Sequence, residues 1–440
     1  MADFFKPVVL ACAAGVLAGC AYGTYDTIEL MPSPVVYSTG EFDPFPDFDD
    51  EDFVAQTQLL YVTDRAPAGP EDWQPRYTYE RGLLIRAGTA DVALHPQVDE
   101  WQEARDITLS GKRDQVYTLS VSETEEIGIL PSDVVQFLEE PPDESEMDAA
   151  SRAFAEEINR QVAYSETKDV FIFVHGYKND FEYPVLVAKE LQHFLGYQGA
   201  FIGFGWPATP HRFAYFRDVE TAAATVRNLR TLVEFLSEET EAERINLIGF
   251  SAGSRLVFEA TKQIALMNKA SGDNGAYTPP RLGEVILIGS DVDRANFGQA
   301  LLDGILDASD RLTVYMSGSD SALDFSSLLS WREQRVGQIW TREEITPVLE
   351  QRILAFETLA LIDVSAADAA DAGSGHSYFR TSPWASSDLI VLLLYGLSPE
   401  DRGLIREPGY PIWQFPSDYP ARITATVAEL ERSAKADLTP

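Results

Sequence analysis

The fold is decided by one stretch, Ile245-Asn246-Leu247-Ile248-Gly249-Phe250-Ser251-Ala252-Gly253-Ser254-Arg255, in which an apolar run ends in Gly-Phe-Ser-Ala-Gly. A helical pattern of apolar residues follows, so this G-x-S-x-G motif lies between a predicted strand and a predicted helix, the context in which it carries chemistry. The glycines allow a sharp turn. The turn brings Ser251 to a helix start, where unpaired backbone N–H groups favour developing negative charge. Because the motif also occurs by chance, Ser251 needs partner residues.

From Lys168 onward, predicted strands alternate with predicted helices. Further strands are expected at 170–174, 200–204, 284–288, 312–316 and 359–362, and helices near 182–195 and from an N-cap at Asp218. The continuous apolar run at 170–174 is typical of a strand covered on both faces of a parallel sheet. The alternation predicts an α/β fold with a mostly parallel sheet flanked by helices.

The chain before this alternation is organised differently. Residues 54–145 are predicted to be a β-rich N-terminal extension, with strands at 58–63, 81–86 and 115–121. A helix is expected at 146–163. We therefore place the α/β core at 146–400 and treat 401–440 as a C-terminal tail without a functional interpretation.

The N-terminus resembles a bacterial lipoprotein signal. Residues 1–19 have a short apolar core, and Leu17-Ala18-Gly19-Cys20 resembles a lipobox in which Cys20 becomes the lipidated N-terminus. An ordinary signal peptide or a buried N-terminal helix is the alternative. With Ala21 after the cysteine, the bacterial sorting pattern indicates an outer-membrane lipoprotein facing the periplasm, held to the membrane only by its lipid. Residues 20–53, rich in proline and acid, are predicted to be a solvated tether.

The formal net charge of −36 argues against two kinds of partner. Nucleic-acid binding requires clustered Lys and Arg against phosphates, so no nucleic-acid partner is expected. The charge also disfavours electrostatic adhesion to anionic lipids, and solubility is its simpler explanation. The two cysteines, Cys12 and Cys20, provide neither a zinc ligand set nor a disulfide framework. No metal and no organic cofactor is expected.

The run from 168 to 380 resembles the α/β-hydrolase superfamily. Three motifs, Tyr61-Val62-Thr63-Asp64-Arg65, Val174-His175-Gly176-Tyr177 and Gly249–Arg255, together resemble a bacterial branch of uncharacterised esterase- or lipase-like hydrolases. This branch has no well-defined substrate. The sequence departs from it in Phe250-Ser251-Ala252-Gly253, where His-Ser-Met-Gly is frequent, and in Gly289-Ser290-Asp291, where Ala-Pro-Asp is frequent. Neither departure removes a catalytic residue.

The resemblance implies the chain order serine, acid, histidine for a catalytic triad. Of the five histidines only His376 follows Ser251, and it lies in a loop of small residues beyond the last predicted core strand. A surface histidine without a role is the alternative. For the acid we favour Asp320 over Asp291, because the penultimate strand usually supplies it in this fold. Asp293 is expected to support the loop.

The same reasoning predicts an oxyanion hole from two backbone N–H groups, those of Ala252 and Tyr177. His175 is expected to hold the loop before Tyr177 rather than to act as a base. Aromatic residues in the surrounding loops are interpreted as core, with an acyl-binding wall as the alternative; they are Tyr177, Phe181, Phe204, Trp206 and Tyr215.

Together these features predict a serine hydrolase that cleaves an ester or related acyl bond of a small-molecule or lipid substrate. The alternative is a hydrolase-fold envelope lipoprotein that has lost activity and serves as a binding or scaffold protein, because fold alone does not determine function.

Overall fold

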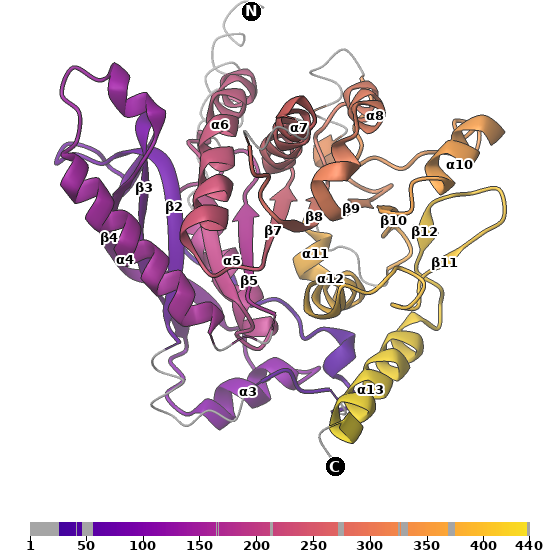
Figure 1. Cartoon of the computed structure of the whole chain (residues 1–440). Helices are drawn as coiled ribbons and strands as arrows, with labels where there is room; N and C mark the ends of the chain where they lie inside the picture. The colour runs from indigo at the N-terminus through magenta and orange to yellow at the C-terminus, as the bar shows by residue number, and fades with distance from the viewer. Residues whose placement is uncertain are drawn as a thin grey trace, which may run out of the picture.

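The computed structural model describes residues 26–40, 42–45, 56–163, 165, 167–211, 214–271, 277–323, 326, 333–367 and 375–437. Within these residues one twelve-stranded sheet organises the molecule, in the order β1-β4-β3-β2-β6-β5-β7-β8-β9-β10-β12-β11 (Figure 1). The strands are β1 (Ile28–Glu29), β2 (Gln58–Pro67), β3 (Tyr77–His95), β4 (Thr118–Leu130), β5 (Asp169–Val174), β6 (Ala200–Gly205), β7 (Arg244–Phe250), β8 (Leu282–Ile288), β9 (Ser309–Met316), β10 (Leu359–Asp363), β11 (Ile405–Arg406) and β12 (Trp413–Gln414).

The centre of the sheet is parallel and its edges are antiparallel. Strands β2, β6, β5, β7, β8, β9, β10 and β12 pair parallel with one another. At one edge β3, β4 and β1 are antiparallel, as is β11 at the other. Because the central strands share a direction, the loops that follow β5, β7, β8 and β9 leave the same edge of the sheet.

Helices cover both faces of this sheet. They are α3 (Trp101–Leu109), α4 (Glu144–Val162), α5 (Glu182–Phe194), α6 (Tyr215–Glu239), α7 (Gly253–Ser271), α8 (Arg294–Asp303), α10 (Pro347–Leu354), α11 (Tyr378–Thr381), α12 (Pro383–Tyr395) and α13 (Tyr419–Asp437). One buried cluster joins α4, α6, α7, α8 and α10 to one face, and a second joins α5, α11, α12 and α13 to the other. The predicted fold, a mostly parallel sheet flanked by helices, is confirmed.

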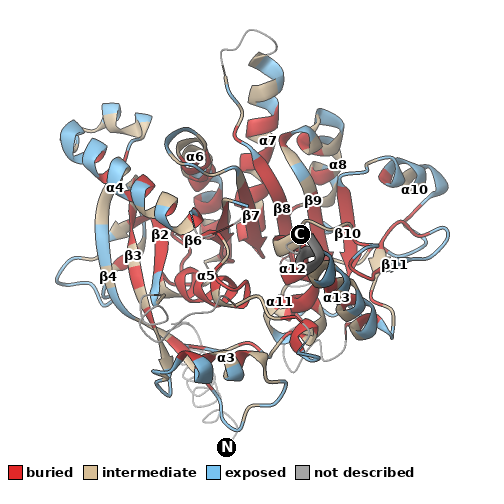
Figure 2. Ribbon diagram, turned by 60° about the horizontal axis from the view of Figure 1, so that its bottom comes forward, coloured by how far each residue is buried: buried red, intermediate tan, exposed pale blue. Residues whose placement is uncertain are grey.

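The alternation of side chains along β5 shows how the strands support both clusters. Val170, Ile172 and Val174 belong to the first cluster, whereas Phe171 and Phe173 belong to the second. Every residue of β5 is buried. Figure 2 shows the same concentration of buried residues in the central strands and in the helix surfaces that face them. A strand of this composition has a continuous apolar sequence because neither face meets water.

The N-terminal extension continues the core sheet. Residues 60–63 of β2 pair in parallel with residues 202–205 of β6. The strands β3 and β4 run longer than their predicted segments, because alternating polar residues on their outer face hide the period from a search for apolar runs. Helix α3, which was not predicted, packs Trp101 and Ala104 into a small separate cluster.

The prediction of a solvated tether at 20–53 is wrong for its described part. Ile28, Met31, Val36, Tyr37 and Phe42 are all buried. Strand β1 pairs with β4, and the 3₁₀ helix η1 (Val35–Tyr37) packs in the same core cluster as α12 and α13. These apolar residues are spaced without a helical or strand period, so composition alone concealed their burial. The signal segment 1–19, Cys20 and most of the acidic run lie outside the described residues.

Two further boundaries need correction. Helix α6 begins at Tyr215, and the Asp218 side chain is not its N-cap but accepts a hydrogen bond of 3.0 Å from the Thr209 backbone N–H. The C-terminal tail is also part of the core, because β12 pairs with β10 and the buried Arg402 forms an ion pair with Asp388 in α12. No helix in the described part of the chain is long and apolar enough to cross a membrane.

Candidate active site

The turn between β7 and α7 has the geometry that the glycine pattern predicts. Ser251 adopts a φ of +54°, in the left-handed region that L-residues rarely enter. A Cβ on Gly249 would lie 2.8 Å from the Ser254 Cα, and one on Gly253 would lie 2.3 Å from the His175 carbonyl oxygen. Both positions therefore require glycine because the backbone passes too closely for a side chain.

Hydrogen bonds hold Ser251 in this conformation. Its N–H donates to the Ile288 carbonyl at 2.9 Å, and its carbonyl accepts the Ser254 hydroxyl at 2.5 Å. The adjacent loop also approaches closely, since a Cβ on Gly176 would lie 2.8 Å from the Ser251 Cβ. Such strain persists only where surrounding contacts enforce it, and it is a frequent property of functional residues.

His376 and Asp320 form a buried pair at the same edge of the sheet. The His376 Nδ1 lies 2.6 Å from the Asp320 Oδ2, and the other carboxylate oxygen accepts the backbone N–H groups of Ala322 and Leu323 at 3.1 and 3.0 Å. A neutral imidazole that donates from Nδ1 presents its Nε2 as an acceptor. The His376 Nε2 is buried and has no hydrogen-bond partner in the described part of the chain.

The histidine lies beside the turn that carries Ser251. Its ring packs against Phe250, the residue before the serine, with ring centroids 4.9 Å apart. Ser251 and His376 line one pocket of about 420 Å³. The sequence predicted that Ser251, His376 and Asp320 belong to one site, and in the structure these three residues lie close to the same pocket.

Asp291, the second choice for the acid, has different partners. Its carboxylate binds the Arg255 Nε at 2.8 Å and the Tyr215 hydroxyl at 3.3 Å, and it contacts Arg335 and Ser326. These contacts anchor the loop after β8 to α6 and α7. Asp293, which was expected to support the loop, is the N-cap of α8 and accepts the Asn296 N–H at 2.9 Å.

The loop after β5 is held by His175. The His175 ring stacks on Trp206 with centroids 5.3 Å apart, and its Nδ1 lies 2.7 Å from the Gly176 carbonyl oxygen. Complete burial holds the His175 pKa well below its ordinary value, so the ring is neutral and donates from one nitrogen only. Tyr177 lies in this loop and lines the pocket, whereas Ala252 is buried directly before α7.

Arg65 supports the same loop from the N-terminal extension. It is fully buried, and its guanidinium donates to the carbonyl oxygens of Asn179 at 2.9 Å and Thr78 at 3.2 Å. Burial lowers the Arg65 pKa to about 10, where it remains charged at neutral pH. The Tyr61–Arg65 motif carries no local sign of this role, because the bond to Asn179 joins residues that are 114 positions apart.

The pocket has a wall that the sequence did not predict. Thr27, Ile28 and Glu29 line it from the N-terminal segment, and Arg380 lines it from α11 while donating to the Glu29 carbonyl at 2.7 Å. Of the five aromatic residues considered for an acyl-binding wall, Tyr177 lines this pocket and the other four are buried core, as the simpler interpretation expected. Within the described residues no group of three His, Cys, Asp or Glu side chains could hold a metal ion.

Comparison with known proteins identifies the central part of the chain. Residues 150–392, more than half of its length, match the model of a family described as "Alpha/beta hydrolase of unknown function (DUF900)". No curated protein and no solved structure matches the chain significantly. The matched span includes α5, β7 and the residues Ser251, Asp320 and His376, but not Arg65 or the strands β1 to β4.

Proposed function

Because this chain belongs to the DUF900 family of α/β hydrolases of unknown function, we propose that it is a serine hydrolase that cleaves esters or related acyl compounds. The observation that carries the proposal is the 2.6 Å contact between His376 Nδ1 and Asp320 Oδ2, with the buried Nε2 of the same ring left free in the pocket that Ser251 lines. A base oriented by a carboxylate, beside a hydroxyl on a strained turn, is the arrangement that activates a serine nucleophile.

In the proposed first step, Ser251 Oγ attacks the carbonyl carbon of the substrate and its proton passes to His376 Nε2. Asp320 keeps the ring in the required tautomer and stabilises its charged form. The backbone N–H groups of Tyr177 and Ala252 stabilise the oxyanion. When the intermediate collapses, the carbon–oxygen bond to the alcohol breaks, and the leaving alcohol takes the proton from His376.

The second step releases the acyl group. His376 accepts a proton from water as the water oxygen adds to the acyl-enzyme carbonyl, and it returns that proton to Ser251 Oγ as the serine ester bond breaks. The products of one cycle are a carboxylic acid and an alcohol, formed from one ester and one water. No other reactant is required.

Fluorophosphonate labelling tests the nucleophile. We expect a fluorescent fluorophosphonate to label the wild-type chain and Ser145→Ala, a control at an exposed serine on α4, but not Ser251→Ala. Labelling should be much slower in His376→Ala, because the base is missing. A folded wild-type protein that is not labelled would instead favour the non-catalytic binding or scaffold function.

We also propose that Cys20 is lipidated and anchors the protein in a bacterial envelope, with the lipid as its only attachment to the membrane. The support is the Leu17–Cys20 pattern and its distance from the N-terminus. Metabolic labelling with a palmitate analogue should modify the wild-type chain but not Cys20→Ser. The proposed partner is a small acyl compound or lipid, and the net charge of −36 disfavours a nucleic acid.

A further inference from the structure

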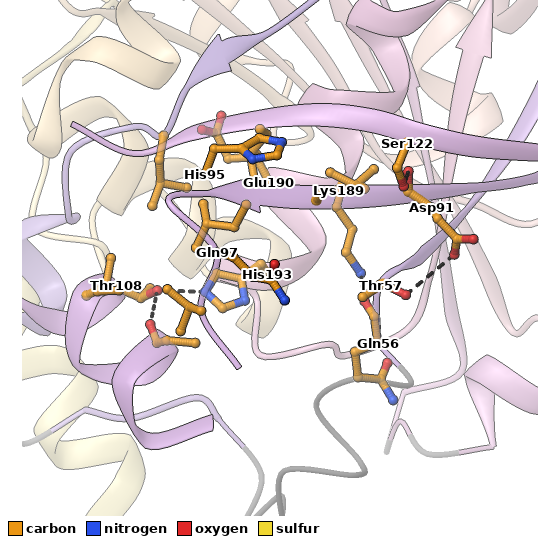
Figure 3. Close-up of a pocket in the computed structure, with 18 of the residues that line it drawn as sticks. Gln56, Thr57, Asp91, His95, Gln97, Thr108, Ser122, Lys189, Glu190 and His193 are labelled. Carbon is orange, nitrogen blue, oxygen red and sulfur yellow. Dashed lines mark hydrogen bonds between the residues drawn. The ribbon is translucent and has the colours of Figure 1, made fainter. Parts of the chain in front are cut away.

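A second cavity, with a volume of about 480 Å³, begins at Leu30, directly after the residues of β1 that line the catalytic pocket. It is lined by the second half of β3, the loop at 97–99, α3, β4 and the C-terminal half of α5, and it is partly open to solvent. In Figure 3, Thr108 of α3 and Asp91 of β3 lie on opposite sides, with His193 and Lys189 of α5 between them. Its volume falls within the range of about 300–1,000 Å³ that is typical of small-molecule sites.

The basic groups in this cavity are already satisfied by the protein. The Lys189 Nζ donates to the carbonyl oxygens of Gln56 and Gln58 and to the Gln192 side chain at 3.0 Å. The His193 ring bonds the Thr108 hydroxyl through Nε2 and the Tyr197 hydroxyl through Nδ1, each at 2.6 Å. Burial lowers the pKa of His193 to about 3, so this ring is neutral.

The acidic groups of the cavity also have hydrogen-bond or ion-pair partners within the protein. Glu190 is paired with Arg380 and also accepts the Met31 N–H. Asp91 accepts the Thr57 hydroxyl at 3.4 Å, and Asp99 accepts the Gln97 amide at 2.6 Å at the exposed rim. Because these groups already have partners, a polar ligand would have to replace existing hydrogen bonds and would gain little.

Gln56, His95 and Ser122 add polar groups to the lining, but most of the remaining wall is apolar, and this apolar part comes from five different segments. It consists of Leu30, Val92, Leu94, Val98, Ile107 and Leu119. Because Lys189, Glu190 and His193 are bonded to the protein, the surface left for a ligand is mainly apolar and favours an apolar occupant. The chemistry of the wall therefore fits a hydrocarbon chain.

The cavity and the catalytic pocket share two structural elements. On α5, Tyr183 lines the catalytic pocket and Lys189 lines the cavity, which at 1.5 Å per helical residue places the two roughly 9 Å apart along the helix. Glu29 faces the pocket and Leu30, its neighbour in the chain, faces the cavity. The Arg380–Glu190 ion pair joins a residue of the pocket to a residue of the cavity.

We propose that this second cavity binds a single hydrocarbon chain of an amphiphilic molecule, and that its source is the acyl chain of the ester held at Ser251. The assignment of the source rests on the proposed function, whereas the binding of a hydrocarbon chain does not. In this proposal the acyl chain runs from Ser251 along α5 and passes the two-residue strand β1 and the Arg380–Glu190 ion pair to enter the cavity. The catalytic residues then lie within the span matched by the family. Most of the cavity residues, which select the length of the acyl chain, lie outside that span.

A chain-length series on the full-length protein tests the source. We compare hydrolysis of butyrate, octanoate and dodecanoate esters by the wild type, by Leu94→Trp, which fills the cavity, and by Leu83→Trp. Leu83 is the matched control, because it lies on the same strand and is 61% exposed. We expect Leu94→Trp to keep its activity on butyrate and to lose about tenfold or more on dodecanoate, while Leu83→Trp keeps both.

A binding measurement tests the cavity without turnover. Ser251→Ala is titrated with a dansyl-labelled undecanoic acid, with and without Leu94→Trp, and we expect the tryptophan to abolish the fluorescence increase. If Leu94→Trp does not fold, Val98→Trp in the loop replaces it, with Val116→Trp, 64% exposed, as its control.

The outcomes separate the two parts of the proposal. Loss of long-chain hydrolysis and of binding in Leu94→Trp supports both parts. Loss of binding with an unchanged chain-length profile supports the cavity but assigns it to a separate lipid, which overturns the acyl chain as the source. A wild type that hydrolyses no ester contradicts the proposed function while the titration still tests the cavity. Unchanged binding and an unchanged profile in a folded Leu94→Trp overturn the proposal.

Discussion

The Arg65 guanidinium donates a hydrogen bond of 2.9 Å to the carbonyl oxygen of Asn179, and through it β2 supports the loop that carries Tyr177. The Asn179 side chain in turn donates to the Gly176 carbonyl at 3.2 Å, and Gly176 passes against Ser251. The extension before the α/β core thus reaches the candidate active site through one buried side chain.

We predict that Arg65→Met lowers both the free energy of unfolding and kcat. Several buried carbonyl oxygens lose their donor, which should cost about 3 kcal/mol, since each hydrogen bond to a charged group contributes about 1.5–3 kcal/mol. Arg65→Lys should not restore activity, because an ammonium lacks the planar fork that reaches separate carbonyls. Urea unfolding and ester hydrolysis measure the two effects. Wild-type kcat in folded Arg65→Met would contradict this role.

A second prediction concerns Asp320. Replacing it with Asn should lower kcat by about 10⁴-fold, because the amide no longer fixes the tautomer of His376 that leaves Nε2 as the base. The change is nearly isosteric, so the melting temperature should stay close to that of the wild type. Steady-state hydrolysis of a short ester and a thermal melt provide the measurements.

Asp291→Asn serves as the comparison for Asp320→Asn. Its carboxylate is buried against Arg255 and Arg335, so breaking these pairs should destabilise the fold by about 3 kcal/mol or more. We expect this variant to be less stable than Asp320→Asn and yet more active. If Asp291→Asn abolished activity while Asp320→Asn retained it, the assignment of the acid would be reversed.

A third prediction tests the space around the histidine. A Cβ on Gly289 would lie 3.1 Å from the His376 Cε1 and 3.4 Å from the Asp320 Oδ2, and Gly289 has a φ of +52°. Gly289→Ala should therefore reduce kcat by roughly tenfold to 100-fold, the order of loss expected when catalytic groups shift by about 1 Å.

Gly298→Ala is the matched control for this substitution. It lies in α8, where a Cβ would meet nothing within 4 Å, so it should leave kcat unchanged and stabilise the helix by about 0.5–1 kcal/mol. A loss of activity in Gly298→Ala equal to that in Gly289→Ala would show that the effect is not local to the histidine.

The sequence predicted those features that depend on a few adjacent residues. The strand, the turn at Ser251 and the following helix are encoded within the stretch 245–255, and the parallel sheet follows from repeated apolar runs such as 170–174. The pairing of His376 with Asp320 was inferred from chain order in a family. The 2.6 Å contact depends on two loops that are 56 residues apart in the sequence.

The features that could not be predicted from the sequence depend on contacts between distant segments. The burial of Tyr37 comes from helices near the C-terminus, and the pocket wall at 27–29 is fixed by Arg380, 351 residues beyond Glu29. From the sequence alone, Arg65 is a charged residue directly after a predicted strand. Its burial can be inferred only when the pairing of β2 with β6 is known. No local period records such contacts, which is why the composition of 20–53 predicts a tether although its described part is buried.

The last prediction concerns Glu284, a buried carboxyl group on β8 away from the catalytic pocket. Burial raises its pKa from 4.5 to about 7, an effect that Arg311, with its Nη1 3.6 Å away, offsets only in part. Its Oε2 is buried without a partner in the described part of the chain. Between pH 4.5 and about 7 the folded protein therefore keeps a proton that the unfolded chain has released. This group makes the protein less stable as the pH rises through that window.

Glu284→Gln should remove this dependence, because the amide is neutral at every pH. The free energy of unfolding of the wild type, measured relative to the variant by urea denaturation, should fall by up to roughly 3 kcal/mol across the window. Glu239→Gln, at an exposed position of α6, controls for the loss of one negative charge and should show no such trend. If the curves of the wild type and Glu284→Gln stay parallel from acid to neutral pH, the carboxyl group is already ionised in the folded protein, and Arg311 outweighs the cost of its burial.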